Sequence, residues 1–318
     1  MNKFISQNML KTACLGTIIT FLTACSSGDS SNLTSGRGGS ANSLLNLDIT
    51  DAAIDDADEV WVEFTGVSIQ PSSDQTDQST IEFTFDTAKR INLLGLQGNK
   101  VQALLIDEII PSGSYDWIRL AVNAERDSTL DSYIKLKDGS THEIFIPSGS
   151  QTGLKLNTGF ELIAAAEFNF TIDFDLRKSV VMTGLNQYQL RPTLRLINNA
   201  VSATISGDVN ASLLSTTGDG CTDNDPLTGN AVYLFSNSDV IPDDIDNQPE
   251  NPFSTALVTL NGNTGKYEYT LGFIPQGNYT ISFTCQAEND NPVTSDSINF
   301  TGTTNISLIP GQVLTFNF

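Results

Sequence analysis

Histidine and the familiar catalytic motifs are almost absent from this sequence of 318 residues. The one histidine, His142, follows an expected Asp138-Gly139 hairpin turn, where a surface side chain is the favoured interpretation. The chain has no HExxH, no GxSxG and no phosphate-binding loop. We therefore predict that the protein has no catalytic residues. A pair of carboxylates that acts on a glycan is the least favoured alternative.

Basic residues are also scarce. Lys and Arg number 16 against 37 Asp and Glu, so the formal net charge is −21. Such a surface repels nucleic acid, which excludes a nucleic-acid partner. After residue 199 the one basic residue is Lys266, so that part of the chain can make almost no salt bridges of its own. Its cohesion must come from apolar burial, backbone pairing and covalent links.

The first 24 residues lack the long apolar run of a transmembrane helix. The apolar stretch 13–24 (ACLGTIITFLTA) is shorter than the ~20 residues that a span needs, and it follows Lys3 and Lys11. This pattern is typical of an export signal. The stretch ends in residues 22–25 (LTAC), which resemble the bacterial lipobox.

The lipobox resemblance implies cleavage after residue 24 and a lipid on Cys25, which would make a membrane the first partner. Ser26 after the cysteine implies the outer membrane of a Gram-negative bacterium. The segment 25–43 is rich in Ser, Gly and Asn, with almost nothing to bury, and it predicts a flexible tether.

Only four cysteines occur, and Cys14 leaves with the signal. Cys221 and Cys285 remain beside Cys25, and an exported pair is expected to form one disulfide. Their spacing does not resemble a zinc site.

Short alternating apolar runs dominate the rest of the chain and predict an all-β protein. In residues 60–69 the alternation breaks at Gly66, where we expect a bulge to reset the faces. The segment 100–110 is ambiguous between a short helix and a buried strand. A sharp change in charge balance near residue 199 predicts two modules, 44–199 and 200–318.

The two modules share a Pro-x-Gly-x-Tyr signature, at residues 111–115 (PSGSY) and 275–279 (PQGNY). Proline fixes φ for a turn, glycine relaxes its exit, and tyrosine begins the next strand. The same signature recurs in transthyretin-like modules. By this analogy we expect two related β-sandwiches.

The first module resembles the family called domain of unknown function 4382, through LDITDAAIDDADEVWVEFTGVSI (47–69), IPSGSQTGLKL (146–156) and DFDLRKSVV (173–181). The family has no established activity, so the resemblance implies a domain and no chemistry. The second module resembles a carboxypeptidase-regulatory or transthyretin-like sandwich, through GKYEYTLGFIPQGNYTISF (265–283). Such modules serve as spacers, stabilisers or binding units.

Calcium is the one cofactor that the sequence suggests, and the protein is not expected to require it. Three acidic clusters could supply oxygen ligands, although none has the spacing of an EF-hand and solvated loop acids are the simpler interpretation. The members are Asp51, Asp55, Asp56 and Asp58; Asp219, Asp223 and Asp225; and Asp243, Asp244 and Asp246.

Aromatic residues offer a candidate binding face. If the aliphatic residues of their strands point into the core, Trp61 faces outward on one strand and Tyr115, Trp117 and Arg119 face outward on another. Exposed aromatics beside charge are typical of sites for a glycan or a protein partner. We therefore expect a non-catalytic binding or adhesion module. A structural subunit of a cell-surface assembly, with the C-terminal strand 312–318 as a donor segment, is the alternative.

Overall fold

Strands make up most of the computed structural model of the protein. The structure describes residues 41–52, 57–75, 77, 79–147, 153–184, 187–191, 193–215, 221, 225–246, 248–249 and 251–318. The strands lie in four sheets with few helical turns between them, so the all-β prediction is confirmed. The helical segments are η1 (Leu93–Leu96), α1 (Leu176–Ser179), η3 (Asn199–Val201), η4 (Ala211–Leu213) and η6 (Ala287–Asn289).

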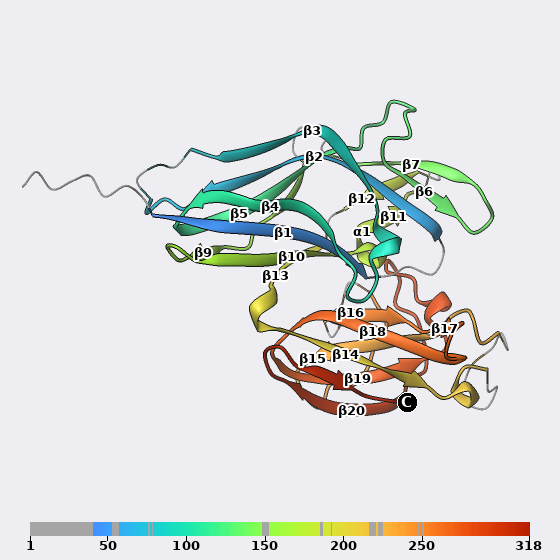
Figure 1. The fold of residues 1–318 in the computed structure, drawn as a ribbon. Coiled ribbons are helices and arrows are strands. Elements are labelled where there is room, and N and C mark those ends of the chain that lie inside the picture. Colours follow the sequence, from blue (N-terminus) through green and yellow to red (C-terminus); the bar gives the residue numbers. More distant parts are fainter. Residues whose placement is uncertain are drawn as a thin grey trace, which may run out of the picture. The chain divides into compact units, whose positions relative to one another are not determined.

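Strands before residue 199 build the first two sheets (Figure 1). The first sheet, in the order β13-β10-β1-β4, contains β1 (Asn42–Ala52), β4 (Gln102–Pro111), β10 (Glu167–Asp175) and β13 (Leu194–Asn198). The second sheet follows the path β11-β12-β7-β6-β2-β5-β8, with β3 on β2 and β9 on β5. Its strands are β2 (Ala57–Pro71), β3 (Ile81–Asn92), β5 (Gly113–Asn123), β6 (Tyr133–Leu136), β7 (Thr141–Phe145), β8 (Leu154–Leu156), β9 (Phe160–Leu162), β11 (Val180–Met182) and β12 (Tyr188–Leu190).

Strands after residue 201 build the third and fourth sheets. The third, in the order β17-β18-β14-β21, contains β14 (Ser202–Val209), β17 (Thr259–Asn261), β18 (Lys266–Pro275) and β21 (Val313–Thr315). The fourth, in the order β16-β15-β19-β20, contains β15 (Ala231–Ser236), β16 (Ser254–Leu257), β19 (Gly277–Thr284) and β20 (Thr301–Leu308). Sheet membership therefore changes between Asn198 and Ser202. Residues 40–318 form one compact unit, and the module limits at 44–199 and 200–318 stay a prediction.

Each pair of sheets encloses its own apolar core, as sandwich packing requires. The first core takes residues from β1 and β10 of one sheet and from β2 and β5 of the other. The second takes residues from β14 and β18 and from β15 and β19. A third, smaller cluster covers the opposite face of β15, because Tyr233 and Phe235 alternate with the core residues Val232 and Leu234.

The bulge predicted in β2 is confirmed. Val60, Val62 and Phe64 are buried, and the pairing register of β2 shifts between Phe64 and Gly66. Beyond the shift Val67 is buried, so the core face is kept despite the odd spacing. A Cβ on Gly66 would lie 2.5 Å from the carbonyl oxygen of Phe83, which explains why glycine stands there.

Each of the two Pro-x-Gly-x-Tyr segments connects a strand of one sheet to a strand of another. Residues 111–115 join β4 of the first sheet to β5 of the second, and residues 275–279 join β18 of the third to β19 of the fourth. In each, the buried tyrosine hydroxyl donates to the carbonyl oxygen of the proline four residues earlier, at 2.8 Å for Tyr279. Burial raises the pKa of Tyr115 to about 12, so its hydroxyl stays protonated and can donate. The signature is thus a corner that carries the chain from one sheet to the other.

The ambiguous segment 100–110 is a strand. β4 pairs antiparallel with β1, and register shifts around Leu47 interrupt its alternation. The C-terminal segment also pairs within its own module: β21 lies parallel to β14, and the Phe318 backbone exchanges hydrogen bonds with Asp208 and Asn210. The segment 312–318, which was considered as a donor strand for another subunit, therefore pairs with β14 of its own chain.

Candidate functional site

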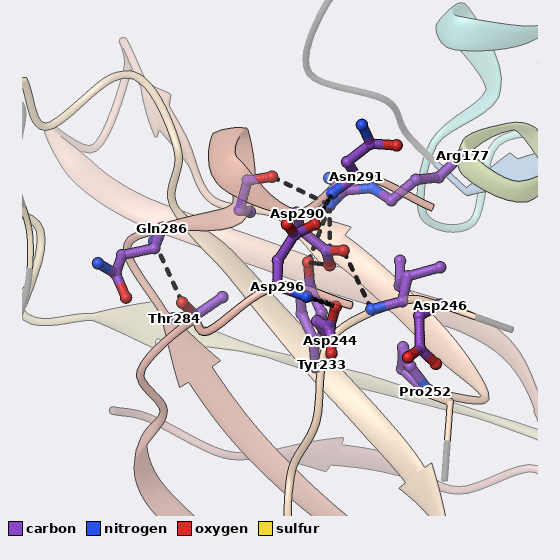
Figure 2. A network of polar contacts seen from close by, with 12 residues as sticks. Arg177, Tyr233, Asp244, Asp246, Pro252, Thr284, Gln286, Asp290, Asn291 and Asp296 are labelled. Carbon is purple, nitrogen blue, oxygen red and sulfur yellow. Dashed lines mark hydrogen bonds and ion pairs between the residues drawn. The ribbon is translucent and has the colours of Figure 1, made fainter. Parts of the chain in front are cut away.

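A cluster of buried carboxylates lies on the outer face of β15 (Figure 2). Asp244 belongs to the connection between β15 and β16, Asp290 follows η6, and Asp296 lies between η6 and β20. One oxygen from each of the three carboxylates lies within 4.8 Å of the other two. Two loops that are distant in sequence therefore meet at one acidic point.

Asp290 is held from several sides. The Tyr233 hydroxyl and the Arg177 guanidinium face its Oδ2, with Arg177 Nη1 at 3.6 Å, and the Ile245 amide donates to Oδ1 at 3.0 Å. Arg177 also donates to the Tyr233 hydroxyl at 2.8 Å and to the Ala287 carbonyl oxygen at 3.3 Å. Burial raises the pKa of Asp290, and the contacts of Tyr233 and Arg177 oppose that rise.

Asp244 is buried, with 1% of its surface exposed. Its Oδ2 accepts a hydrogen bond from the Asp296 amide, while Oδ1 has no hydrogen-bond partner among the described residues. Burial, together with Asp243 and Asp290, raises the pKa of Asp244. Asp296 is half-buried and accepts from the Asn291 amide at 2.7 Å.

The chemistry of this cluster is that of oxygen ligands and charge. Carboxylates and a tyrosine hydroxyl surround the point where the three side chains meet, and the arginine supplies one positive charge. Hard cations prefer such oxygen ligands. His142 lies elsewhere, on β7, where its Nε2 contacts the Ser140 hydroxyl at 3.0 Å and its ring packs near Tyr188.

Cations from the first module reach residues of the second. Besides Arg177, Lys178 donates to the Pro252 carbonyl oxygen at 2.9 Å and pairs with Asp175 at 3.2 Å. Arg195 pairs with Asp173 and lies 4.2 Å from the centre of the Phe253 ring. Three cations that precede residue 199 thus supply positive charge to the second module, which has little of its own. This arrangement was not predicted from the sequence.

The structure describes only some of the acidic residues expected as calcium ligands, so the three predicted clusters stay a prediction. Asp51 is buried and Asp58 is exposed, while Asp55 and Asp56 lie outside the described residues. Asp225 is exposed, and Asp219 and Asp223 also lie outside the described residues. In the third cluster Asp243 accepts from the Asp244 amide at 3.1 Å, and Asp246 is buried, accepting from the Gln248 amide at 2.7 Å. Among the members of the predicted clusters that the structure describes, Asp244 is the one that joins the three-carboxylate group.

The candidate binding face needs a correction. Tyr115 is 1% exposed and packs its ring 5.1 Å from that of Phe160, because the register of β5 shifts opposite Gln70 and turns Tyr115 into the core. Trp117 and Arg119 are half-buried on the outer face, as expected. Trp61 is also half-buried, but it lies about nine residues along β2 from the partner of Trp117, roughly 30 Å away. The two tryptophans therefore do not share one patch.

Trp117 has two cationic neighbours. Arg119 lies 4.8 Å and Lys155 lies 4.6 Å from the centre of the indole ring, and the register places Arg119 opposite Lys155 on β8. Trp61 instead donates from Nε1 to Glu59 at 2.6 Å and stacks against Tyr133. Trp117 thus has two cations near its ring, whereas Trp61 contacts a carboxylate that is paired with Lys135.

The predicted disulfide is present. Cys221 and Cys285 are bonded, with their Cα atoms 5.4 Å apart, and both are buried in the second core. The predicted export signal and the predicted lipidation site Cys25 lie outside the described residues. No helix in the described part of the chain has the length and apolarity needed to cross a bilayer.

Asp290, Asp296 and Arg177 were missed as site residues. The signal was present in the segment 288–296 (ENDNPVTSD), which combines acids with turn-forming residues as the chosen clusters do. What the sequence could not supply is the meeting of this segment with Asp244, 46 residues before Asp290 in the chain.

Comparison with known proteins finds a family that matches part of the chain. Residues 42–192, just under half of the sequence, match the family described as Domain of unknown function (DUF4382), as the sequence resemblance predicted. No curated protein matches the chain.

Solved structures give only distant similarity. The Bacillus anthracis TIE protein is 11% identical, with 87% of this chain covered and a TM-score of 0.19, and this chain covers 34% of its length. GBS52, the minor pilin of Streptococcus agalactiae, is 10% identical over 86% of this chain and 94% of its own, with a TM-score of 0.18. A fimbrial protein from Bacteroides ovatus is 9% identical over 88% of this chain and 49% of its own, also with a TM-score of 0.18. TM-scores this low do not establish a shared fold or function.

Proposed function

We propose that this protein is exported, is held to a membrane by a lipid on Cys25, and acts at the cell surface by binding a partner rather than by catalysis. The lipobox at residues 22–25 and the short apolar stretch before it support the anchor. Several acyl chains on one cysteine would hold the protein stably, since each buried methylene contributes about 0.8 kcal/mol.

The spacing between Cys25 and the first strand suits a tethered module. β1 begins at Asn42, and Ala41 already accepts a hydrogen bond from the Ser112 amide at 2.8 Å. The 16 residues from 26 to 41 could span at most about 55 Å when fully extended. As a flexible coil they would span roughly 20–25 Å. Either length lifts the sheets clear of lipid headgroups.

A cationic aromatic spot on the second sheet, formed by Trp117, Arg119 and Lys155, is the observation that favours binding. We call it the Trp117 spot. On a chain with a formal net charge of −21, two cations beside one indole ring stand out. An indole face stacks on the apolar face of a sugar ring, and the cations attract carboxylate or sulfate groups. The chemistry therefore fits an acidic polysaccharide of the cell surface or its surroundings.

One experiment tests both the anchor and the ligand. The full-length protein and its Cys25→Ser, Trp117→Ala and Trp61→Ala variants would be expressed in a Gram-negative host. Fractionation should find the protein with the membranes and Cys25→Ser in the soluble fraction. Labelled polygalacturonate, as the acidic probe, should bind purified wild type and Trp61→Ala but should bind Trp117→Ala at least about tenfold more weakly.

The two parts of the proposal fail separately. Membrane association of Cys25→Ser equal to that of wild type would remove the lipid anchor. Equal binding by the two tryptophan variants, or binding of neutral dextran as strong as that of polygalacturonate, would remove the Trp117 spot as a site for acidic glycans. Trp61→Ala is the matched control, because it deletes a half-buried indole from the same face of the same sheet.

A further inference from the structure

We propose that Asp244, Asp290 and Asp296 form a binding site for a divalent cation, with Ca²⁺ as the preferred ion. The three residues come from two loops, and one oxygen from each lies within 4.8 Å of the others. Calcium binds oxygen ligands at about 2.3–2.6 Å, so two ligands on opposite sides of one ion are roughly 4.8 Å apart. The three carboxylates are therefore close enough to share a single ion.

One carboxylate oxygen of Asp244 is buried without a hydrogen-bond donor, which indicates that a ligand binds beside it. Asp244 is 99% buried, its carboxylate faces those of Asp290 and Asp296, and its Oδ1 has no hydrogen-bond partner among the described residues. Leaving a buried carboxylate oxygen unpaired is costly, because the group has lost its water without gaining a donor. A cation bound between the three side chains would provide the missing interaction.

The charge of the cluster favours the same conclusion. Arg177 supplies one positive charge beside Asp290, against three carboxylates. Like charges at this separation repel one another, so the group is costly to ionise fully without a further cation. A divalent cation and Arg177 together would balance the negative charge of the three carboxylates.

The remaining ligand positions are available on the same side chains. Each ionised carboxylate has about four lone-pair positions, so the bonds that Asp290 accepts from Tyr233 and Ile245 leave room for a metal. Asp296 is half-buried, which gives the ion a route from solvent. Water and backbone oxygens complete the six to eight ligands that calcium takes, and Mg²⁺, with its stricter octahedral geometry, should bind less well.

The test uses the purified full-length protein after treatment with a chelator, and it does not depend on the lipid anchor or on the Trp117 spot. Calorimetric titration with CaCl₂ should give one equivalent of binding. Calcium at about a hundredfold excess over Kd should raise Tm by at least about 3 °C relative to a salt-matched control. MgCl₂ should give a smaller rise.

Two variants locate the ion. Asp244→Asn keeps the shape of the side chain and an oxygen for the Asp296 amide, so it should fold with a Tm no lower than that of calcium-free wild type. It should lose the calcium-dependent rise in Tm. Asp296→Asn, at a half-buried position, should weaken calcium binding at least about tenfold. Asp58→Asn is the control, because it removes an exposed aspartate at the start of β2, away from the cluster, and should respond as wild type does.

No rise in Tm beyond the salt control would overturn the site. So would a full calcium response in both Asp244→Asn and Asp296→Asn, since the ion would then bind elsewhere. Loss of the response in Asp58→Asn with retention in the other two would place the ion near Asp58 and overturn the assignment to Asp244, Asp290 and Asp296.

Discussion

Removing the Cys221–Cys285 disulfide should cost the protein a large share of its stability. The bonded residues are 64 apart in sequence, and the bridge closes a loop that contains β15, β16, β17, β18 and β19. On the chain-entropy model a loop of this length contributes about 4 kcal/mol, because the cross-link restricts the unfolded chain. A typical domain has about 5–15 kcal/mol in all.

The change to make is Cys221→Ala with Cys285→Ala, in the full-length protein. Both side chains are buried in the second core, so alanine removes the sulfurs without adding a polar group there. Urea unfolding at several wavelengths should give a free energy of unfolding about 4 kcal/mol below that of wild type. The corresponding fall in Tm is roughly 8–16 °C. Wild type treated with a reductant should approach the double variant.

The reasoning fails if the double variant unfolds within about 1 kcal/mol of oxidised wild type. It also fails if wild type under non-reducing conditions reacts with a maleimide at both cysteines. A single variant, Cys285→Ala, separates the two contributions to the loss. It breaks the bridge as completely as the double variant does, so a clearly smaller effect would show that packing of the sulfurs, and not the cross-link, provides the stability.

Arg177→Met should lower the free energy of unfolding by about 3 kcal/mol near neutral pH, because it leaves the buried Asp290 carboxylate without its charged partner. Burial already raises the pKa of Asp290, so the stabilising contribution of this group is complete below its unfolded-state pKa and is lost as pH rises through the folded-state value. Without Arg177 that folded value rises further. The deficit measured by urea unfolding should therefore grow from about pH 4 to pH 7, and a deficit independent of pH would contradict this account. Gly66→Ala should cost about 1–3 kcal/mol by thermal unfolding, because its Cβ would meet the Phe83 carbonyl oxygen at 2.5 Å. Gly95→Ala, whose Cβ would meet open space, is the matched control, and equal losses in the two variants would refute the close-contact explanation.

Local patterns in the sequence predicted the parts of the fold that local chemistry decides. The alternation in β2 and its reset at Gly66 follow from which residues must be buried on either side of a bulge. The Pro-x-Gly-x-Tyr corners follow from the φ of proline and the freedom of glycine. The strand in residues 100–110 stayed ambiguous because its register shifts against β1 erase the period of two. Tyr115 was assigned to the wrong face for the same reason.

The candidate site depended on contacts that no local pattern contains. Asp244 was recognised within an acidic loop, but its partners Asp290 and Asp296 come from the connection after β19, and the two segments meet through the contacts of Ile245 with Asp290 and of Asp244 with Asp296. In the sequence Arg177 stands beside two nearby acids, Asp173 and Asp175. It pairs instead with Asp290, more than a hundred residues away, and Asp173 takes Arg195. Sequence spacing cannot distinguish such partners until the topology is known.

The position of β1 within the first sheet determines how the protein would respond to a pulling force. The chain enters the described structure at β1, which lies between β10, parallel to it from Leu44 to Ala52, and β4, antiparallel to it. A pull on the chain ahead of Asn42 acts along the strand, so both ladders of backbone hydrogen bonds are loaded in shear. The bonds then share the load, whereas a strand peeled from the edge of a sheet breaks them one at a time. If the chain is held ahead of β1 as proposed, β1 would act as a mechanical clamp, and drag on the protein would be resisted at this strand.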